Sequence, residues 1–188
     1  MSAAHNENTR VKIPAILHLC GLGYEYLSLH GAEYDRGTNI FSGIFLSKVK
    51  EFNPNLSDIE ANALLEQVKL LLDYEDLGKA FYNLLTSRSG VKLIDFEDFS
   101  KNALHVVTEL PCEVGDDSFR PDITLLINGL PLVFIEVKKP NNQDGIQAEF
   151  KRLNARIKRG IFKKFFNITQ LMVFSNNMEY ADDSTLPL

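Results

Sequence analysis

Tryptophan is absent from this 188-residue sequence, and cysteine occurs only twice, as Cys20 and Cys112. Because the two cysteines stand far apart with no Cys-x-x-Cys spacing, neither a structural zinc site nor a disulfide framework is expected. No apolar run approaches the ~18–20 residues that a membrane-spanning helix needs. The polar first residues also lack the apolar stretch of a signal peptide. These absences predict a protein with no membrane partner, located in the cytoplasm.

Positive charge is also scarce overall, since 20 Lys and Arg face 25 Asp and Glu for a formal net charge of −5. Such a balance argues against a protein that grips nucleic acid by its overall field. The charge is unevenly distributed, however. Between Lys138 and Phe166 the chain carries nine basic residues, opposed only by Asp144 and Glu149. The sequence therefore has a locally basic stretch on an acidic body.

Several chemical motifs are missing as well. No Gly-x-x-x-x-Gly-Lys-Ser/Thr loop occurs, so the chain itself is not expected to bind ATP in that way. The four histidines are scattered without metal-ligand spacing, and no Ser/His/Asp or Cys/His arrangement stands out. The composition, 45% hydrophobic and 24% charged, is typical of a globular protein. With no internal repeat and no Gly/Ser linker, one domain over residues 1–188 is the simplest expectation.

The amino-terminal part has the apolar spacing of helices. We expect helices over residues 11–19, 41–52, 57–72 and 74–85, with a short strand over 24–29. The helix over 57–72 opens with Ser57, and Glu60 follows three residues later, which predicts a capping box. Its apolar face is expected to hold Ile59, Ala63, Leu64, Val68, Leu71 and Leu72.

After Gly90 the pattern changes to short β-branched or aromatic runs separated by turn residues. We expect strands over residues 91–96, 104–110, 123–127, 132–137 and 171–175, with a basic amphipathic helix over 144–160 before the last strand. The sequence thus predicts an α/β (α+β) fold, a central sheet flanked by helices. A helical part would cover about 1–88 and a sheet-containing core about 89–180.

Asn128-Gly129 is a strong hairpin signal, because both residues tolerate a positive φ. Side chains alternate between the two faces along each strand. If the aliphatic faces of residues 123–127 and 132–137 are buried together, Leu125 pairs with Val133 and Ile123 with Ile135. The same register sets Asp122 opposite Glu136, with Lys138 two residues further along the same face.

Two carboxylates on facing residues repel each other unless a cation lies between them. Mg²⁺ meets this need, since it takes one or two protein carboxylates and completes its shell with water and phosphate oxygens. We therefore expect Asp122 and Glu136 to be metal ligands. Lys138 would orient or help to deprotonate a water, or offset the charge that develops on a phosphate. The predicted chemistry is Mg²⁺-assisted hydrolysis of a phosphodiester without a covalent protein intermediate.

The plainer alternative is a set of ordinary charges at a hairpin end, with Asp122 and Lys138 as a surface pair. Charges are common at strand ends. Here they adjoin continuous apolar runs of the kind that is buried on both faces of a sheet, and Pro121 suits the first position of a strand. These two features support a site in the interior of the sheet as much as ordinary surface charges, and both interpretations stay open at this point.

Pro121-Asp122, followed after thirteen residues by Glu136-Val137-Lys138, matches the PD-(D/E)xK nuclease pattern. Longer phrases are more specific: "VKLIDF", "RPDITLLINGLPLVFIEVKKP" and "QLMVFSNN", with "GLGYEYL" and "NIFSGIF" upstream. Together they resemble the amino-terminal nuclease domain of the type I restriction enzyme endonuclease subunit, over nearly the whole chain. The resemblance implies a restriction-endonuclease-like core with extra amino-terminal helices.

The resemblance also implies that Asp122 and Glu136 bind the metal and that Lys138 is the catalytic lysine. It implies a fragment of a longer subunit that continues into an ATP-driven DNA translocase. Double-stranded DNA would be the substrate, and methyltransferase and specificity subunits would be partners. Two other interpretations stay open. One is a non-catalytic DNA-binding or subunit-docking module with a nuclease-like fold, and the other is a stand-alone nuclease whose gene stops near Leu188.

The basic helix departs from the family pattern. Family members usually carry a Gln-x-x-x-Tyr pair there, but the best-aligned positions are Arg152 and Arg156. These two share a face with Arg159, and arginine forks suit phosphate oxygens. We expect the three arginines, with Lys139, to contact DNA; a solvated face with local salt bridges is the alternative. A third acidic ligand from an upstream helix would be Glu60, Glu66 or Glu75, with no basis for choosing among them.

Overall fold

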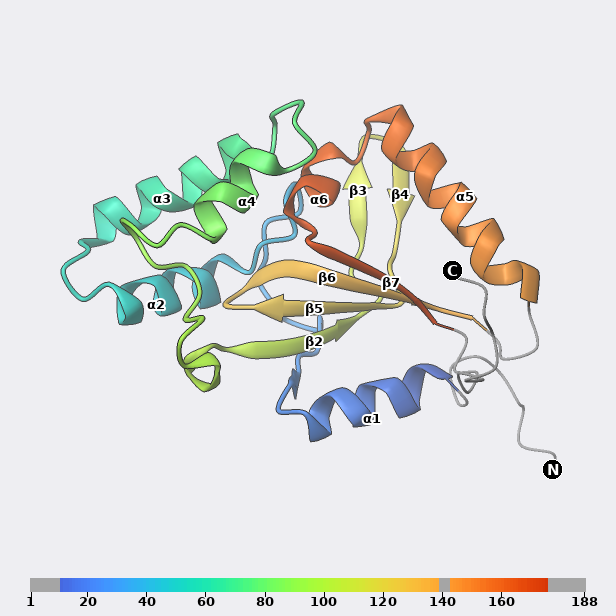
Figure 1. The fold of residues 1–188 in the computed structure, drawn as a ribbon, viewed down its shortest axis with the longest axis horizontal. Helices are drawn as coiled ribbons and strands as arrows, with labels where there is room; N and C mark the ends of the chain where they lie inside the picture. Colours follow the sequence, from blue (N-terminus) through green and yellow to red (C-terminus); the bar gives the residue numbers. More distant parts are fainter. Residues whose placement is uncertain (1–10, 139–142, 176–188) are drawn as a thin grey trace.

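The computed structural model describes residues 11–138 and 143–175. Its centre is a mixed five-stranded sheet with the order β1-β2-β5-β6-β7 (Figure 1). β1 pairs with β2, and β6 with β7, in parallel, whereas β5 lies antiparallel to both of its neighbours. The strands are β1 (Glu25–Tyr26), β2 (Leu104–Thr108), β5 (Ile123–Ile127), β6 (Leu130–Val137) and β7 (Leu171–Ser175). The fold prediction, a mixed central sheet flanked by helices, is confirmed.

Helices cover both faces of this sheet. In Figure 1, α1 lies below the sheet, and α3, α4, α5 and α6 lie above it. A separate two-stranded hairpin, β3 (Cys112–Val114) with β4 (Asp117–Phe119), stands between α6 and α5. The helices are α1 (Ile13–Gly21), α2 (Ser42–Phe52), α3 (Asp58–Leu71), α4 (Lys79–Leu85), α5 (Gln143–Arg159) and α6 (Lys163–Ile168). Among the described residues, none of these helices combines the length and the apolarity needed to cross a bilayer.

The register of the β5–β6 hairpin is the one expected from its two aliphatic faces. Ile123 pairs with Ile135, and Leu125 pairs with Val133. At the closed end Asn128 and Gly129 have φ of 52° and 80°, so both central turn residues have positive φ, as a type I′ turn requires. Near this end Leu126 pairs with Pro131 rather than with Leu132, so the register is shifted by one residue from that at Leu125. Leu132 is therefore the extra residue of a β-bulge on β6.

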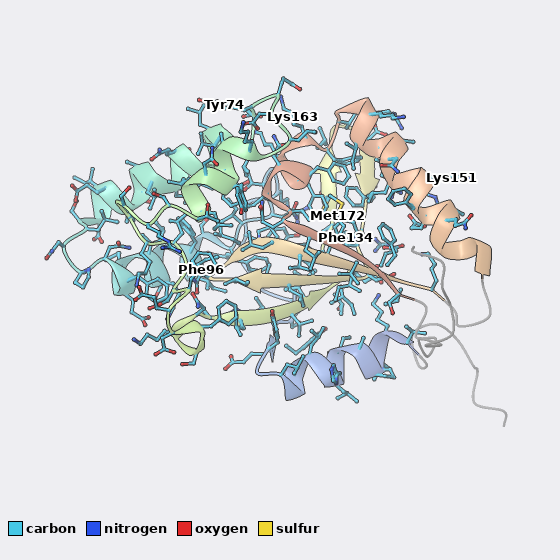
Figure 2. All side chains as sticks on the ribbon, viewed as in Figure 1. Tyr74, Phe96, Phe134, Lys151, Lys163 and Met172 are labelled. Carbon is cyan, nitrogen blue, oxygen red and sulfur yellow. The ribbon has the colours of Figure 1, made fainter. Side chains whose placement is uncertain are left out.

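The two faces of the hairpin are buried in different clusters. On the α1 face, Ile123, Leu125 and Val137 contact Ala15, Ile16 and Leu19 of α1. On the opposite face, Phe134 of β6 and Met172 of β7 pack with Leu153 of α5 and the phenylalanines of α6. Figure 2 labels Phe134 and Met172 in the space between the sheet and these helices. β5 and β6 are therefore interior strands with helices on both sides.

The capping box of α3 is confirmed, since Ser57 accepts from the Glu60 backbone and the Glu60 side chain accepts from Ser57. The predicted apolar face is partly wrong. Ile59 is 83% exposed and Ala63 is exposed, whereas Ala61 and Leu65 are buried with Leu64 and Val68. The buried face is thus rotated from the predicted one, and its leucines and Val68 pack in one cluster with residues of α2 and α4.

The predicted strand over residues 91–96 is wrong. The segment is buried at Leu93, Ile94 and Asp95 but pairs with no strand in the described sheets. Side chains satisfy its backbone instead: Asn53 accepts from the Lys92 N–H and donates to the Lys92 carbonyl. An apolar run can thus be buried without a ladder when asparagines supply the missing hydrogen bonds.

Other boundaries also differ. α4 begins at Lys79 rather than near residue 74, since Leu77 and Gly78 have positive φ and the Asp76 carboxylate accepts from the Gly78 and Ala80 N–H groups. The first strand is only two residues long. The β3–β4 hairpin and α6 were not predicted, because three-residue strands and a six-residue helix are too short to show a period.

The tip of the β5–β6 hairpin rests directly on α2. The Gly129 carbonyl accepts from the Phe41 N–H at 2.9 Å. A Cβ on Gly129 would lie 2.6 Å from the Phe41 carbonyl oxygen and 2.9 Å from the Phe45 nitrogen. Only glycine therefore fits both the positive φ and the close backbone approach at this position.

We predict that Gly129→Ala lowers the free energy of unfolding by about 3 kcal/mol, because strain at positive φ adds to a backbone clash. Gly115→Ala is the matched control: its φ is also positive, at 59°, but its Cβ would have no neighbour within 4 Å. That control should cost only about 1 kcal/mol. Urea unfolding measures both. Equal losses would mean that the approach to α2 contributes nothing.

Candidate active site at the hairpin end

Asp122, Glu136 and Lys138 come together at the open end of the β5–β6 hairpin. Ile123 pairs with Ile135, and the same register one residue further toward the open end sets Asp122 opposite Glu136. The Lys138 Nζ lies 2.7 Å from Glu136 Oε1. All three side chains are largely buried, with 16–18% of their surface exposed. The three predicted site residues are thus neighbours in a sheltered position, as an interior site requires and a solvated strand end does not.

Both oxygens of Asp122 have polar neighbours. Oδ2 accepts from the Val137 N–H at 2.9 Å, which ties β5 to β6 at this end. Oδ1 lies 3.4 Å from the Nζ of Lys12, just before α1. Lys12 also forms an ion pair with Glu109, the residue after β2. Sequence reasoning missed Lys12 and Glu109, because their separation from Asp122 in the chain hides the contact.

Burial raises the pKa of Glu136 above its ordinary value. The ion pair with Lys138 opposes this rise, whereas the negative charges of Asp122 and Glu149 add to it. For Lys138 burial lowers the pKa, but the Glu136 ion pair and the charges of Glu149 and Asp122 outweigh burial, so its pKa lies above the ordinary value. Lys138 is therefore a cation at neutral pH, held among carboxylates.

Glu149 of α5 is a further acidic residue that sequence reasoning left out of the site. Its side chain is only 6% exposed, unusually buried for a glutamate. Three cations surround it: Arg152 Nη1 at 2.7 Å, Lys138 Nζ at 3.5 Å and Arg156 Nη1 at 3.7 Å. The only signal in the sequence was that Glu149 is one of two acids in a basic stretch. Its place beside Lys138 depends on how α5 folds back over β6.

A cleft of about 340 Å³ lies between the hairpin end and α5, and neither Asp122 nor Lys138 lines it. Glu136 and Glu149 line it, and Glu109 and Arg120 lie on its wall. Among the described residues, no three Asp, Glu, His or Cys side chains are arranged as a complete metal site. Two carboxylates suffice for Mg²⁺, which completes its shell with water and substrate oxygens. The carboxylate pair therefore fits a hard divalent ion, and mutual repulsion is one cause of the raised Glu136 pKa.

The predicted DNA-contacting residues separate into two groups. Arg152 and Arg156 line the cleft, where Glu149 pairs with both and the Arg156 guanidinium lies 4.9 Å from the centroid of the Phe119 ring. Arg159 does not line the cleft and pairs with Asp117 of β4. Lys139 lies outside the described residues. Lys151, labelled in Figure 2, is exposed on α5.

The basic helix was predicted to be amphipathic, and its apolar side chains differ in burial. Leu153 is buried and Ile157 is partly buried against the same cluster. Phe150 is 55% exposed, and Ile161 lies beyond the end of α5. The side chain of Ile146 lies outside the described part.

None of the three candidate helical acids reaches the cleft. Glu60 caps α3, Glu66 pairs with Lys69, and Glu75 pairs with Lys163 near Tyr74 at the top of Figure 2. The structure gives each of them a local structural role. Glu149 is the third acid that lies close to Glu136 and Lys138.

A helix-flanked mixed sheet, whose central hairpin ends in two carboxylates and a lysine, defines the class of nuclease-like α/β domains. The chain belongs to the family described as type I restriction enzyme R protein N terminus, whose model matches residues 4–181. The resemblance found in the sequence is thereby confirmed.

Named relatives agree with the family. The chain is 29% identical to the type I restriction enzyme HindI endonuclease subunit of Haemophilus influenzae, over 76% of this chain and 16% of that protein. It is 28% identical to a Methanocaldococcus jannaschii protein provisionally named as the type I restriction enzyme MjaIXP endonuclease subunit, over 95% of this chain and 19% of that protein. A Staphylococcus aureus relative, the SauCOLORF180P endonuclease subunit, is 28% identical over 69% of this chain and 13% of its own length. The chain thus spans less than a fifth of these relatives.

We predict that Glu136→Gln stabilises the metal-free protein at neutral pH. Because folding raises the Glu136 pKa, this carboxyl group favours the folded state below its ordinary value of 4.5, and that stability is lost as pH rises through the folded pKa. With a chelator present, the variant should therefore show a higher unfolding midpoint at pH 7.5, and the difference should vanish near pH 4.

Glu60→Gln is the control of opposite sign, since hydrogen bonds from Ser57 lower the Glu60 pKa. That substitution should lower the midpoint at pH 7.5. A loss of stability in Glu136→Gln at pH 7.5 would contradict the electrostatic account of the hairpin end.

Proposed function

We propose that this chain is a Mg²⁺-dependent endonuclease domain that hydrolyses phosphodiester bonds of double-stranded DNA within an ATP-dependent type I restriction-modification complex. The observation that carries the proposal is the sheltered group of Asp122, Glu136 and Lys138 beside a cleft that Arg152 and Arg156 line. Two carboxylates for a hard cation, one lysine and two arginines are the groups that phosphate chemistry uses. Family membership supports the same activity.

Asp122 and Glu136 would hold the ion. When bound, Mg²⁺ supplies Lewis-acid polarisation of a phosphoryl oxygen and lowers the pKa of a coordinated water. The chain's own groups provide the rest. Lys138 is buried between Glu136 and Glu149, and its ammonium can orient the attacking water and offset charge on the phosphoryl group. Because its pKa is raised, Lys138 acts here as a cation rather than as a base.

Arg152 and Arg156 are suited to bind the phosphate backbone, since guanidinium groups form paired hydrogen bonds with phosphate oxygens. Glu149 now holds both, and Arg152 is still 60% exposed in its side chain. A phosphate entering the cleft would share these arginines with Glu149, while Glu149 keeps its contact with Lys138. Glu149 is thus a positioning residue for the cations of the cleft.

The partners of the chain follow from its relatives. They are named as endonuclease subunits and are more than five times longer than this chain. We infer that this domain works with ATP-driven translocase domains of the same subunit, and with methyltransferase and specificity subunits, in the cytoplasm. ATP would act in the translocase domains and not at the cleft.

A second candidate function is a non-catalytic DNA-binding or docking module. The observation that favours it is the internal pairing of Arg152 and Arg156 with Glu149, at the positions where family members carry a Gln-x-x-x-Tyr pair. In such a module the hairpin charges would bind no metal. The two candidates therefore differ in Mg²⁺ binding and in cleavage.

We predict that Lys138→Ala, assayed in the full assembly with ATP and Mg²⁺, lowers DNA cleavage by about 100-fold or more, the usual loss when a charge-stabilising donor is removed. ATP hydrolysis should continue, because the translocase is a separate part. Lys101→Ala is the control. Lys101 is the last residue of the 3-10 helix η2 (Phe99–Lys101) and pairs with Asp98 just before that helix. The helix precedes β2, whose first residue pairs with Ile127 at the closed end of the hairpin, away from the site. Unchanged cleavage in Lys138→Ala would assign the chemistry to another site.

We also predict that Mg²⁺ stabilises this chain and that Glu136→Ala abolishes the effect. At about ten times the dissociation constant, a bound ion adds about 1.4 kcal/mol to the free energy of unfolding. Thermal unfolding with and without Mg²⁺ measures this gain. A docking module would show no Mg²⁺-dependent shift in either protein, which would remove the basis of the nuclease proposal.

A further inference from the structure

Lys12 is a buried cation next to the predicted metal site. Its side chain is only 9% exposed, and it contacts two acids, Asp122 and Glu109. A lysine this deeply buried normally needs a charged partner. The proposed metal ion would also bind Asp122, but it would not bind Glu109.

The position of Lys12 is set by α1 rather than by its own ion pairs. Val11, immediately before it, is 3% exposed and packs on Val106, Ile123 and Val137. Ala15, Ile16 and Leu19 of α1 continue the same contact. These apolar contacts anchor the backbone of Lys12 near the end of β5.

Glu109 is held beside Asp122 by the backbone. Its N–H donates to the Asp122 carbonyl at 3.2 Å, and its φ of 53° is unusual for a non-glycine residue. Glu109 also lies on the wall of the cleft. Lys12 therefore has a second acceptor within reach, on a residue whose backbone is bonded to Asp122.

We propose that Lys12 is an internal counter-ion that competes with the divalent cation for Asp122 and passes wholly to Glu109 when the cation binds. The inference rests on the proposed metal-binding role of Asp122 and goes beyond it, because it assigns a regulatory residue outside the hairpin motif. In the metal-free state Lys12 offsets the charge of Asp122, and Glu136 is offset by Lys138 in the same way. Metal binding has to displace the first of these cations, so the Lys12 ammonium group lowers the metal affinity.

The test is a calorimetric titration of Mg²⁺ into the wild-type chain and into Lys12→Met, which keeps a side chain of similar length without the charge. Removing the competing ammonium should raise the Mg²⁺ affinity about fivefold, the size expected from a partly buried ion pair. Lys48→Met is the matched control, since Lys48 is similarly buried, at 14% exposed, but pairs with Glu51 of α2 and does not line the cleft. Its affinity should change less than twofold.

Lys12→Gln serves as a second variant in case methionine perturbs the α1 contact, and circular dichroism checks the folding of both. A further measurement needs no substitution: the NMR signal of the Lys12 ammonium should shift during the Mg²⁺ titration of the wild-type chain, with the midpoint found by calorimetry. An affinity that is unchanged or lower in the folded Lys12 variants, or an unmoved Lys12 signal at saturating Mg²⁺, overturns the proposal.

Failure of the proposed function has a different signature. In that case the wild-type chain and both Lys12 variants would take up no Mg²⁺, and Asp122→Asn would alter nothing in the titration. A third outcome is that the wild-type chain binds Mg²⁺, Asp122→Asn abolishes this binding, and the Lys12 variants bind as the wild type does. That outcome would refute the competition by Lys12 and leave the proposed function standing.

Discussion

A two-residue turn closes the β5–β6 hairpin, and Ile127 pairs with Leu130 beside it. If the strands continued in this register without a bulge, Asp122 would pair with Ile135. The bulge at Leu132 shifts the pairing by one residue, so that Asp122 instead stands opposite Glu136. Because facing residues of antiparallel strands share a face, only the shifted register brings both carboxylates to one side. The tight turn is anchored in turn by the contact of Gly129 with Phe41 and by the buried Asn128 side chain, which bonds Ala103, Leu93 and Asn102. Every property of the site depends on this register.

The charges that meet at the hairpin end are kept close to balance by the fold itself. Asp122 has Lys12, Glu136 has Lys138, and Glu149 has Arg152 and Arg156. Burying an unpaired carboxylate would cost several kcal/mol, so each acid near the cleft comes with a cation. The cation of Asp122 precedes α1, that of Glu136 follows β6, and those of Glu149 lie on α5 itself. The pKa of Glu136 nevertheless remains raised, first because the carboxyl group is buried and then because Asp122 and Glu149 are negative. The ion pair with Lys138 thus offsets only part of the cost of burying this carboxylate.

Sequence reasoning predicted the parts of the fold that have a clear period or a specific turn. The bounds of β5 and β7, the capping box of α3 and the register at Leu125 follow from alternation, capping chemistry and buried aliphatic faces. It failed where tertiary contacts override a local pattern: residues 91–96 bond to asparagine side chains rather than to a strand, and Ile59 faces solvent. The meeting of Asp122, Glu136 and Lys138 at the hairpin end was predicted, because it follows from the hairpin register. Glu149 and Lys12 could not be predicted, since nothing local marks a helical residue that folds back onto a distant strand.

The hairpin motif therefore specifies less of the site than its spacing suggests. Asp122, Glu136 and Lys138 lie within one short stretch, but the charges that tune them come from α5 on one face of the sheet and from the residue before α1 on the other (Figure 1). Two relatives could keep an identical motif and still differ in metal affinity or phosphate contact through residues 12, 149, 152 and 156. In this chain, arginines at positions 152 and 156 make Glu149 the acid that shapes the cleft. The charge arrangement of the site is accordingly a property of the packed helices as much as of the strand residues between them.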